Sequence, residues 1–319
     1  MKRTDLFKNG AIAFAMVILA LSCPLTASSQ DSSRLIGRWN LTVQGSEGAH
    51  PSWIEVRKSG YKSLVGSFVG QFGSARPVGE IEFDGNLFRF SVPPQWEKRN
   101  DDLIFFGTFK GKRIQGTSTD LEGNPIHWTG QRSPKLKRHA PSTWGKPRMI
   151  FDGKTLNGWS PRSSTVPNGW EVKNGFLTNA TPGNDLLTKE KFDDFKLYAE
   201  FRYPEASNSG IYLRGRYEMQ IEDNYGDDPE SHKVGGIYGF LTPSTNASKP
   251  AGEWQSAEVT LVGRVVTVIL NGERVIDRQT IPGATGGALD NDEASPGPLM
   301  IQGDHGPVEF RKLTISLPQ

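Results

Sequence analysis

The stretch Phe195-Lys196-Leu197-Tyr198-Ala199-Glu200-Phe201 alternates apolar and polar residues with a period of two. The segment from Val259 to Asn271 has the same period and ends in Leu270-Asn271-Gly272-Glu273, a turn typical of β-hairpins. Period-two alternation predicts strands that place one face in a core. Because further segments of this kind surround these two, and no Rossmann or P-loop fingerprint occurs, we predict a jelly-roll β-sandwich over residues 148–319.

The first half of the chain also has the features of a β-domain. Short apolar runs alternate with glycines, as in Ser63–Gly70 and Leu103–Phe109, and turn residues recur between them. We predict a small antiparallel β-barrel domain over residues 30–131. The following segment 132–147, RSPKLKRHAPSTWGKP, is basic and rich in proline, and we expect it to be a linker. The whole chain is therefore expected to be all-β.

A known sequence pattern occurs at the beginning and the end of the predicted barrel domain. Gly37-Arg38-Trp39 stands near the start, and Trp128 and Arg132 stand near the end. This pattern resembles the opening and closing residues of lipocalin-like barrels. The resemblance, which covers residues 35–132, implies that the tryptophan plugs one end of the barrel and that the arginine packs over it. The alternative is that these are ordinary core residues of another β-domain.

Charge is distributed unevenly along the chain. The 319 residues include 37 Lys and Arg against 35 Asp and Glu, a net charge of +2. Residues 30–143 carry 16 basic and 11 acidic side chains, and residues 144–319 carry 18 basic and 23 acidic ones. The two halves therefore have opposite charges of equal size, so they either attract each other or face different partners. The near-neutral total argues against a general nucleic-acid binder.

The first 29 residues have the features of a signal peptide. Lys2, Arg3 and Lys8 precede an apolar run over 11–21, and small residues at 27–29 suit a signal peptidase. We expect export to the periplasm or the exterior, and no integral membrane span, because no later segment is apolar for long enough. The lone Cys23 gives a minority alternative, a lipoprotein. Without it the chain has no thiol for a disulfide, a nucleophile or a zinc site.

A series of motifs in the second half identifies a family. In order along the chain these motifs are Phe151–Trp159, Asn208–Gly215, Tyr217–Asp223, Gly236–Gly239, Lys249–Trp254 and Gln302–Gly306. Their order and spacing resemble the 3-keto-disaccharide hydrolase domain family over residues of about 150–317. The resemblance implies a concanavalin A-like jelly roll, a hydrolase activity and a carbohydrate substrate. One departure from the family pattern is Gln255, where asparagine is usual.

The motif YEMQIE has two chemically different faces. In a strand, Tyr217, Met219 and Ile221 point to one side, while Glu218, Gln220 and Glu222 point to the other. The first set predicts core residues and the second a polar row. If no bulge intervenes, Tyr212, Arg214 and Arg216 extend this row, which would suit sugar hydroxyls. The alternative is a solvated sheet face with cross-strand ion pairs.

The implied substrate suggests a mechanism and roles for residues. A ketone at C3 acidifies the C2 hydrogen, so a base can form an enolate that expels the C1 oxygen before water adds. This route needs a base, an acid and a positive charge rather than two carboxylates in a fixed geometry. We predict Glu218 as base or acid, His305 as the complementary proton carrier and Arg214 as the enolate stabiliser. The predicted substrate-binding residues are Tyr212, Gln220, Asp223, Trp254 and Gln302.

Metal binding and two other functions stay open on sequence alone. The acidic stretches Asp223–Glu230 and Asp290–Glu293 would suit calcium, but their spacing is not that of an EF-hand and favours solvated loops. The sequence establishes no cofactor; a divalent metal, calcium or a transition metal, that assists the enolate is an alternative. The other functions are a laminarinase-like glycosidase on unmodified glycans and a noncatalytic carbohydrate-binding protein. Against the former, the chain has no Glu-x-Asp-x-x-Glu array, and Glu218-x-Gln220-x-Glu222 has an amide in the middle position.

Overall fold

The computed structural model describes residues 32–46 and 48–319. The predicted signal peptide and Cys23 lie outside the described residues. Within the described part of the chain, no helix has the length and apolarity needed to cross a membrane. The only helical element described there is a single 3-10 turn, η1 (Ser32–Arg34), which confirms the all-β prediction.

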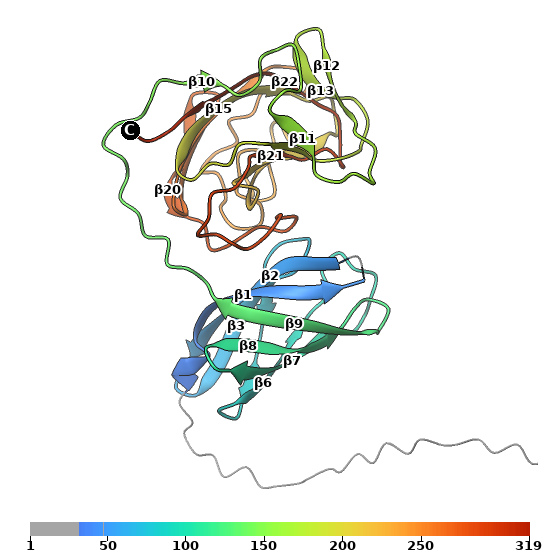
Figure 1. Cartoon of the computed structure of the whole chain (residues 1–319), viewed down its shortest axis with the longest axis vertical. Coiled ribbons are helices and arrows are strands. Elements are labelled where there is room, and N and C mark those ends of the chain that lie inside the picture. The colour runs from blue at the N-terminus through green and yellow to red at the C-terminus, as the bar shows by residue number, and fades with distance from the viewer. Residues whose placement is uncertain (1–31, 47) are drawn as a thin grey trace, which may run out of the picture. The chain divides into compact units, whose positions relative to one another are not determined.

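Nine antiparallel strands over the described residues 37–46 and 48–132 form one curled sheet (Figure 1). Along the sheet the order is β4-β3-β2-β1-β9-β8-β7-β6-β5, and β3 and β4 at one edge approach β5 and β6 at the other. The sheet therefore almost closes into the predicted barrel. The strands are β1 (Gly37–Gly45), β2 (Gly48–Ser59), β3 (Ser63–Val69), β4 (Arg76–Val78), β5 (Ile81–Phe83), β6 (Leu87–Val92), β7 (Leu103–Lys110), β8 (Arg113–Thr119) and β9 (Pro125–Arg132).

One end of the barrel has the predicted plug. Trp39 is buried, and its indole Nε1 donates to the Leu35 carbonyl oxygen at 2.8 Å. The Arg132 guanidinium carbon lies 3.8 Å from the centroid of the Trp39 ring, and Nη1 donates to the Ile36 carbonyl oxygen at 2.6 Å. The arginine thus seals the tryptophan and satisfies backbone oxygens of the entering chain.

Residues 148–319, all of them described, form two facing sheets. The larger sheet has the order β12-β13-β22-β15-β18-β19-β20, with β10 paired to β22, and the smaller has the order β11-β14-β21-β16-β17. The strands of the larger sheet are β10 (Arg148–Met149), β12 (Trp170–Lys173), β13 (Phe176–Asn179), β15 (Phe195–Arg202), β18 (Gln255–Val262), β19 (Val265–Leu270), β20 (Glu273–Thr280) and β22 (Val308–Ser316). Those of the smaller sheet are β11 (Trp159–Pro161), β14 (Leu186–Thr188), β16 (Asn208–Leu213), β17 (Tyr217–Glu222) and β21 (Met300–Ile301).

The hydrophobic core fills the space between these two sheets. Alternate residues of β15, beginning with Phe195 and Leu197, are buried in it, as the period-two pattern predicts. The alternating segment Val259–Asn271 is not one strand, however. It turns at Gly263, whose φ of +58° suits glycine, so Val262 pairs with Val265. The predicted Asn271-Gly272 hairpin turn is confirmed, because Leu270 pairs with Glu273.

A loop after β20 joins the sandwich to the barrel. Arg38 of β1 forms an ion pair with Glu293, which is fully buried. The Trp53 indole donates to the Ala284 carbonyl oxygen at 2.8 Å, and the Asn40 amide donates to the Asn291 carbonyl oxygen at 2.7 Å. These contacts bury the outer face of β1 and β2 against residues 282–293, so the two halves bind each other, one of the two outcomes expected from their charges.

Arg132, the first residue of the predicted linker 132–147, ends β9, and residues 133–147 contain only an isolated bridge from Trp144 to Pro318. The linker contacts the sandwich rather than running free. Arg138 pairs with Asp194 at 3.0 Å, and the Gly145 amide donates to the Leu317 carbonyl oxygen at 2.8 Å. The proposed domain boundaries at 131 and 148 stay predictions.

Candidate active site

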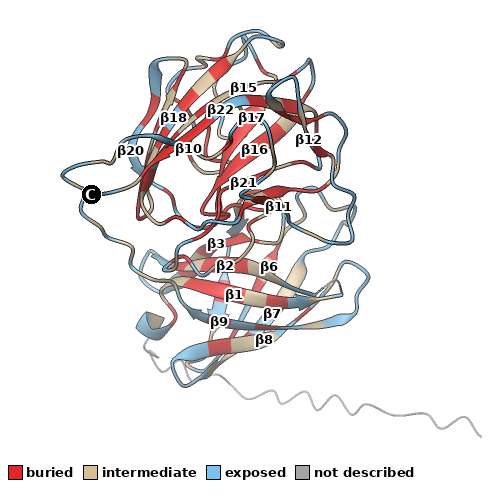
Figure 2. Ribbon diagram, turned by 45° about the horizontal axis from the view of Figure 1, so that its top comes forward, coloured by how far each residue is buried: buried red, intermediate tan, exposed pale blue. Residues whose placement is uncertain are grey.

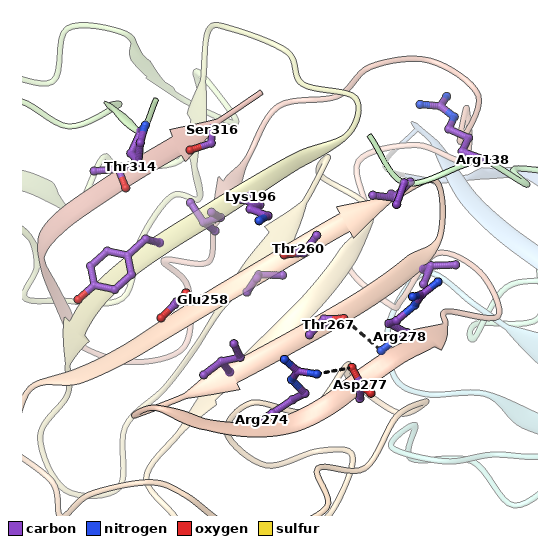
Figure 3. Close-up of a pocket in the computed structure, with 18 of the residues that line it drawn as sticks. Arg138, Lys196, Glu258, Thr260, Thr267, Arg274, Asp277, Arg278, Thr314 and Ser316 are labelled. Carbon is purple, nitrogen blue, oxygen red and sulfur yellow. Dashed lines mark hydrogen bonds and ion pairs between the residues drawn. The ribbon is translucent and has the colours of Figure 1, made fainter. Parts of the chain in front are cut away.

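Two cavities lie on the outer faces of the two sandwich sheets. The first, of about 690 Å³, lies over β15, β18, β19 and β22 (Figure 3). Its carboxylates, Glu258 and Asp277, are exposed, and Asp277 is paired with Arg274 at 3.2 Å. Hydroxyl and basic side chains point outward from the strands between them (Figure 3). This cavity has no buried acid, and we assign no chemistry to it.

The second cavity, of about 560 Å³, lies over the smaller sheet and contains most of the predicted site residues. Glu218 and Gln220 of β17, Tyr212 of β16 and the segment 302–305 line it. Strands β16 and β17 are buried along most of their length, on both faces (Figure 2). The remaining lining residues are Phe72, Gly73, Ser74, Gln95, Trp96, Arg162, Asp185, Asn208, His232, Tyr238, Gly286 and Gly287.

Glu218 is the buried acid of this cavity. Its side chain points away from the core side of β17, and Gly210 on the neighbouring strand leaves room for it, since a Cβ there would collide with the carboxylate. The Glu218 backbone N–H donates to Thr285 Oγ1 at 3.1 Å, so the loop after β20 covers this part of the sheet. Burial raises the pKa of Glu218 to about 8, because it disfavours the charged form. Glu218 therefore holds a proton at neutral pH.

Three predicted substrate-binding residues lie beside Glu218. Tyr212 is its cross-strand partner, and the Tyr212 hydroxyl donates to the Gly286 carbonyl oxygen at 3.1 Å. Within the described part of the chain, Oε1 of Gln220 and Oε1 of Gln302 are buried without a hydrogen-bond partner. Buried acceptors are usually hydrogen-bonded, and these two belong to residues that line the cavity.

His305 forms a pair with its neighbour Asp304 at the rim of the cavity. The imidazole Nδ1 is hydrogen-bonded to the Asp304 carboxylate, and about half of each side chain is exposed. This hydrogen bond raises the pKa of His305 above its usual value. The nearby Glu218 and Asp185 act in the same direction. The pairing leaves Nε2 as the ring nitrogen that can exchange a proton with a ligand.

Arg162 and Asp185 are site residues that the sequence motifs missed. Arg162 Nη1 donates to Asp185 Oδ2 at 2.9 Å and to the Gly287 carbonyl oxygen at 3.2 Å. The Gly303 backbone N–H donates to Asp185 Oδ1 at 3.0 Å. The guanidinium is therefore held at the cavity beside the Gln302–His305 segment. Both residues lie in loops whose contacts are set by the fold, so no short spacing in the sequence could reveal them.

Arg214 is not in the cavity, and its predicted place in the polar row is wrong. Its φ of +54° puts it in the turn between β16 and β17, which breaks the alternation that Tyr212 begins. The side chain is fully buried, and its guanidinium donates to the Gly263 carbonyl oxygen at 2.7 Å and to Asp193 Oδ1 at 3.2 Å. Its contacts are those of a structural arginine that ties the turn to the larger sheet.

Two predicted substrate-binding residues also lie elsewhere. The guanidinium groups of Arg202 and Arg311 lie over the Trp254 ring, with their carbons at 4.8 Å and 4.5 Å from the ring centroid. Asp223 Oδ2 accepts the Ala206 backbone N–H at 2.9 Å and does not line the cavity. Both residues belong to family motifs, but their contacts here stabilise the ends of strands and loops.

The acidic stretches do not gather into a metal site. Among the described residues, no group of three or more His, Cys, Asp or Glu side chains is arranged to hold a metal ion. In the second stretch, Glu293 and Asp290 are paired with Arg38 and Arg216.

The fold and the cavity define a jelly-roll protein with a buried acid, an Asp-oriented histidine and unsatisfied amides on one sheet face. Residues 146–316 match the model of the 3-keto-alpha-glucoside-1,2-lyase-like domain, which is more than half of the chain. The chain belongs to this family, and the resemblance found in its sequence motifs is confirmed.

Two kinds of relatives are similar to the chain. A 3-keto-disaccharide hydrolase of Bacteroides thetaiotaomicron is 24% identical over an alignment of 164 residues, and the match covers 40% of this chain and 57% of the relative. The matched part thus spans little more than half of that protein. Two crystal structures of provisionally assigned glycosyl hydrolases from Parabacteroides distasonis are 22% and 26% identical and cover 54% and 59% of this chain and 94% and 95% of theirs, with TM-scores of 0.45 and 0.44.

Proposed function

We propose that this protein is a glycoside-cleaving hydrolase that acts on 3-keto-glycosides. The observation that carries the proposal is the cavity in which protonated Glu218 and the His305–Asp304 pair occur together. Family membership and the name of the Bacteroides relative support the substrate class. The proposal therefore combines a proton-transfer site with a family whose description names 3-keto sugars.

In the proposed reaction His305 is the base and Glu218 is the acid. Neutral His305 takes the C2 proton of the 3-keto sugar on Nε2, while its Nδ1–H is held by Asp304. The electron pair of the C2–H bond forms the enolate of the C3 ketone. The enolate then expels the C1 oxygen, which takes the proton of Glu218, and a double bond forms between C1 and C2.

Hydration completes the reaction. Ionised Glu218 takes a proton from water, the hydroxyl adds to C1, and C2 recovers its proton from His305, so both residues return to their starting states. The products are a 3-keto sugar and the free leaving group, and no oxidant or reductant is needed. Arg162, rather than Arg214, is the cation at the cavity and takes the predicted role of stabilising the enolate oxygen.

The test compares a disaccharide with its 3-keto derivative. We expect the protein to consume only the oxidised sugar, and we expect solvent deuterium in the intermediate or product at C2, detected by NMR. Cleavage of the unmodified disaccharide without exchange at C2 would favour a laminarinase-like hydrolase. Binding of either sugar without turnover would favour a noncatalytic carbohydrate-binding protein.

Export remains part of the proposal. The features of residues 1–29 support an exported enzyme that meets its substrate outside the cytoplasm. Mass spectrometry of the mature N-terminus from an expressing cell tests this, with a start near Gln30 expected and a lipidated Cys23 as the contrary result.

A further inference from the structure

The barrel contributes one wall of the cavity in which Glu218 lies. Phe72, Gly73 and Ser74 after β3, and Gln95 and Trp96 after β6, line the same cavity as the sandwich residues. None of these five barrel residues belongs to the family motifs of the second half. The cavity is therefore lined by residues from both halves of the chain, which are also joined by direct contacts.

An aromatic pair is the main feature of this wall. The rings of Phe72 and Trp96 meet edge to face, with centroids 6.1 Å apart. Although both line a cavity, 46% of Phe72 and 52% of Trp96 are exposed. A sugar ring stacks well on such an exposed aromatic face because its C–H groups are apolar.

The pair is held in place by buried polar contacts. Gln95 Nε2 donates to Ser74 Oγ at 2.6 Å, and the Ser74 backbone N–H donates to Gln95 Oε1 at 3.0 Å, which ties the two loops together. Below them Arg76 and Glu97 form a buried ion pair at 2.6 Å. The aromatic rings therefore extend from a fixed base rather than from free loops.

The barrel loop that carries Phe72 also contacts the loop after β20, which covers Glu218. The Gly287 backbone N–H donates to the Gln71 carbonyl oxygen at 2.8 Å, and a Cβ on Gly286 would collide with the backbone of Gly73. A Cβ on Gly287 would collide with the Tyr212 hydroxyl. Glycines at 286 and 287 thus let the barrel loop approach the cross-strand partner of Glu218 closely.

We propose that Phe72 and Trp96 form the binding site for the leaving group, and that the leaving group is a second pyranose ring. The proposal rests on the proposed function, because it places the 3-keto ring next to Glu218 and His305. The ring beyond the scissile oxygen then lies against the aromatic pair on the barrel. The barrel would accordingly select disaccharides over simple alkyl glycosides.

The experiment compares two substrates that share the 3-keto-glucosyl ring, a 3-keto-disaccharide and methyl 3-keto-glucoside. We expect Trp96→Ala to lower kcat/KM for the disaccharide about tenfold, mainly through KM, and to change the methyl glycoside less than about twofold. Trp96→Phe should recover part of the loss. The matched control is Phe106→Ala. Phe106 is an exposed barrel phenylalanine (53%) outside the cavity, so this variant should leave kcat/KM for both substrates unchanged.

Equal losses on both substrates, or no loss on either, would overturn the proposal. If the wild type cleaves neither substrate, the proposed function fails and calorimetric titration with the 3-keto-disaccharide decides the binding site separately. A dissociation constant that rises about tenfold in Trp96→Ala would then support the aromatic platform. Unchanged binding in that variant, or no binding by the wild type, would overturn it.

Discussion

The outer faces of the two sandwich sheets begin from the same sequence pattern and end in different chemistry. On the larger sheet, the outward residues Glu258, Arg274 and Asp277 are exposed to solvent (Figure 3). On the smaller sheet, the outward residues Glu218 and Gln220 are buried, and β17, which carries them, is coloured as buried along most of its length (Figure 2). In both sheets the strands alternate polar with apolar residues, so alternation alone does not distinguish a solvent-exposed face from a covered one.

The difference is what covers the smaller sheet. The loop after β20 lies over it through Thr285 and Gly286, and the barrel packs on that loop through Trp53 and Arg38. Burial raises the pKa of Glu218, and the side-chain oxygen Oε1 of Gln220 is buried without a hydrogen-bond partner. The burial of this face, and with it the raised pKa of Glu218, therefore comes from the loop and the barrel that cover it.

The largest expected effect is the loss of the buried acid. Glu218→Gln should lower kcat on a 3-keto-disaccharide by about 10³, because the amide cannot give a proton to the leaving oxygen. The matched control is Glu258→Gln on the exposed face, which should keep the wild-type rate. Steady-state kinetics with a poor leaving group makes the measurement sensitive to this step. Near-normal turnover in the Glu218 variant would remove the acid assignment.

The second effect concerns the cover itself. Arg38→Met leaves Glu293 buried without its ion pair to the barrel, which should lower the free energy of unfolding by about 3 kcal/mol. Arg89→Met removes an exposed pair with Glu82, at 2.9 Å, and should cost less than about 1 kcal/mol. Urea denaturation of both variants measures the contrast. Equal costs would mean that the contact between the halves contributes little to stability.

The sequence predicted the sheets better than it predicted the site. Period-two alternation placed Phe195 and Leu197 in the core, and the family motifs included Glu218, His305 and Gln302, which the structure brings to one cavity. The prediction for Arg214 was wrong because the turn between β16 and β17, in which Arg214 and Gly215 have positive φ, interrupts the alternation. Alternation in the sequence cannot reveal such a turn.

Residues from distant segments could not be predicted in the same way. Arg162 reaches the cavity from a loop, and Trp96 reaches it from the other half of the chain. Their places depend on long-range packing, and a single sequence carries no direct signal for such contacts. The raised pKa of Glu218 belongs to the same category, because it depends on burial by residues more than sixty positions away.

The third effect is a dependence of stability on pH. The pKa of Glu218 is raised in the folded state, so its contribution to stability is complete below its unfolded value of about 4.5 and is lost as pH rises through about 8. Glu218→Gln removes this loss. The stability of the variant minus that of the wild type should therefore be larger at pH 8 than at pH 5, by about 3 kcal/mol. Thermal or urea unfolding at the two pH values measures it, and Glu258→Gln should show no such difference.

The smallest effect concerns the orientation of the histidine. His305 must be neutral to accept the C2 proton, and its pKa is raised by Asp304, so the acid limb of the activity profile should lie above 6.5. Asp304→Asn should move this limb to lower pH and reduce the plateau rate about tenfold. The alkaline limb near pH 8, which reports Glu218, should move less, because burial is the main cause of the raised pKa of Glu218 and the Asp304 charge is a smaller one. Asp277→Asn removes the corresponding carboxylate from the exposed face and should leave both limbs unchanged. An acid limb that does not move in Asp304→Asn would mean that this carboxylate only positions the loop, and that the covered face owes its reactivity to Glu218 alone.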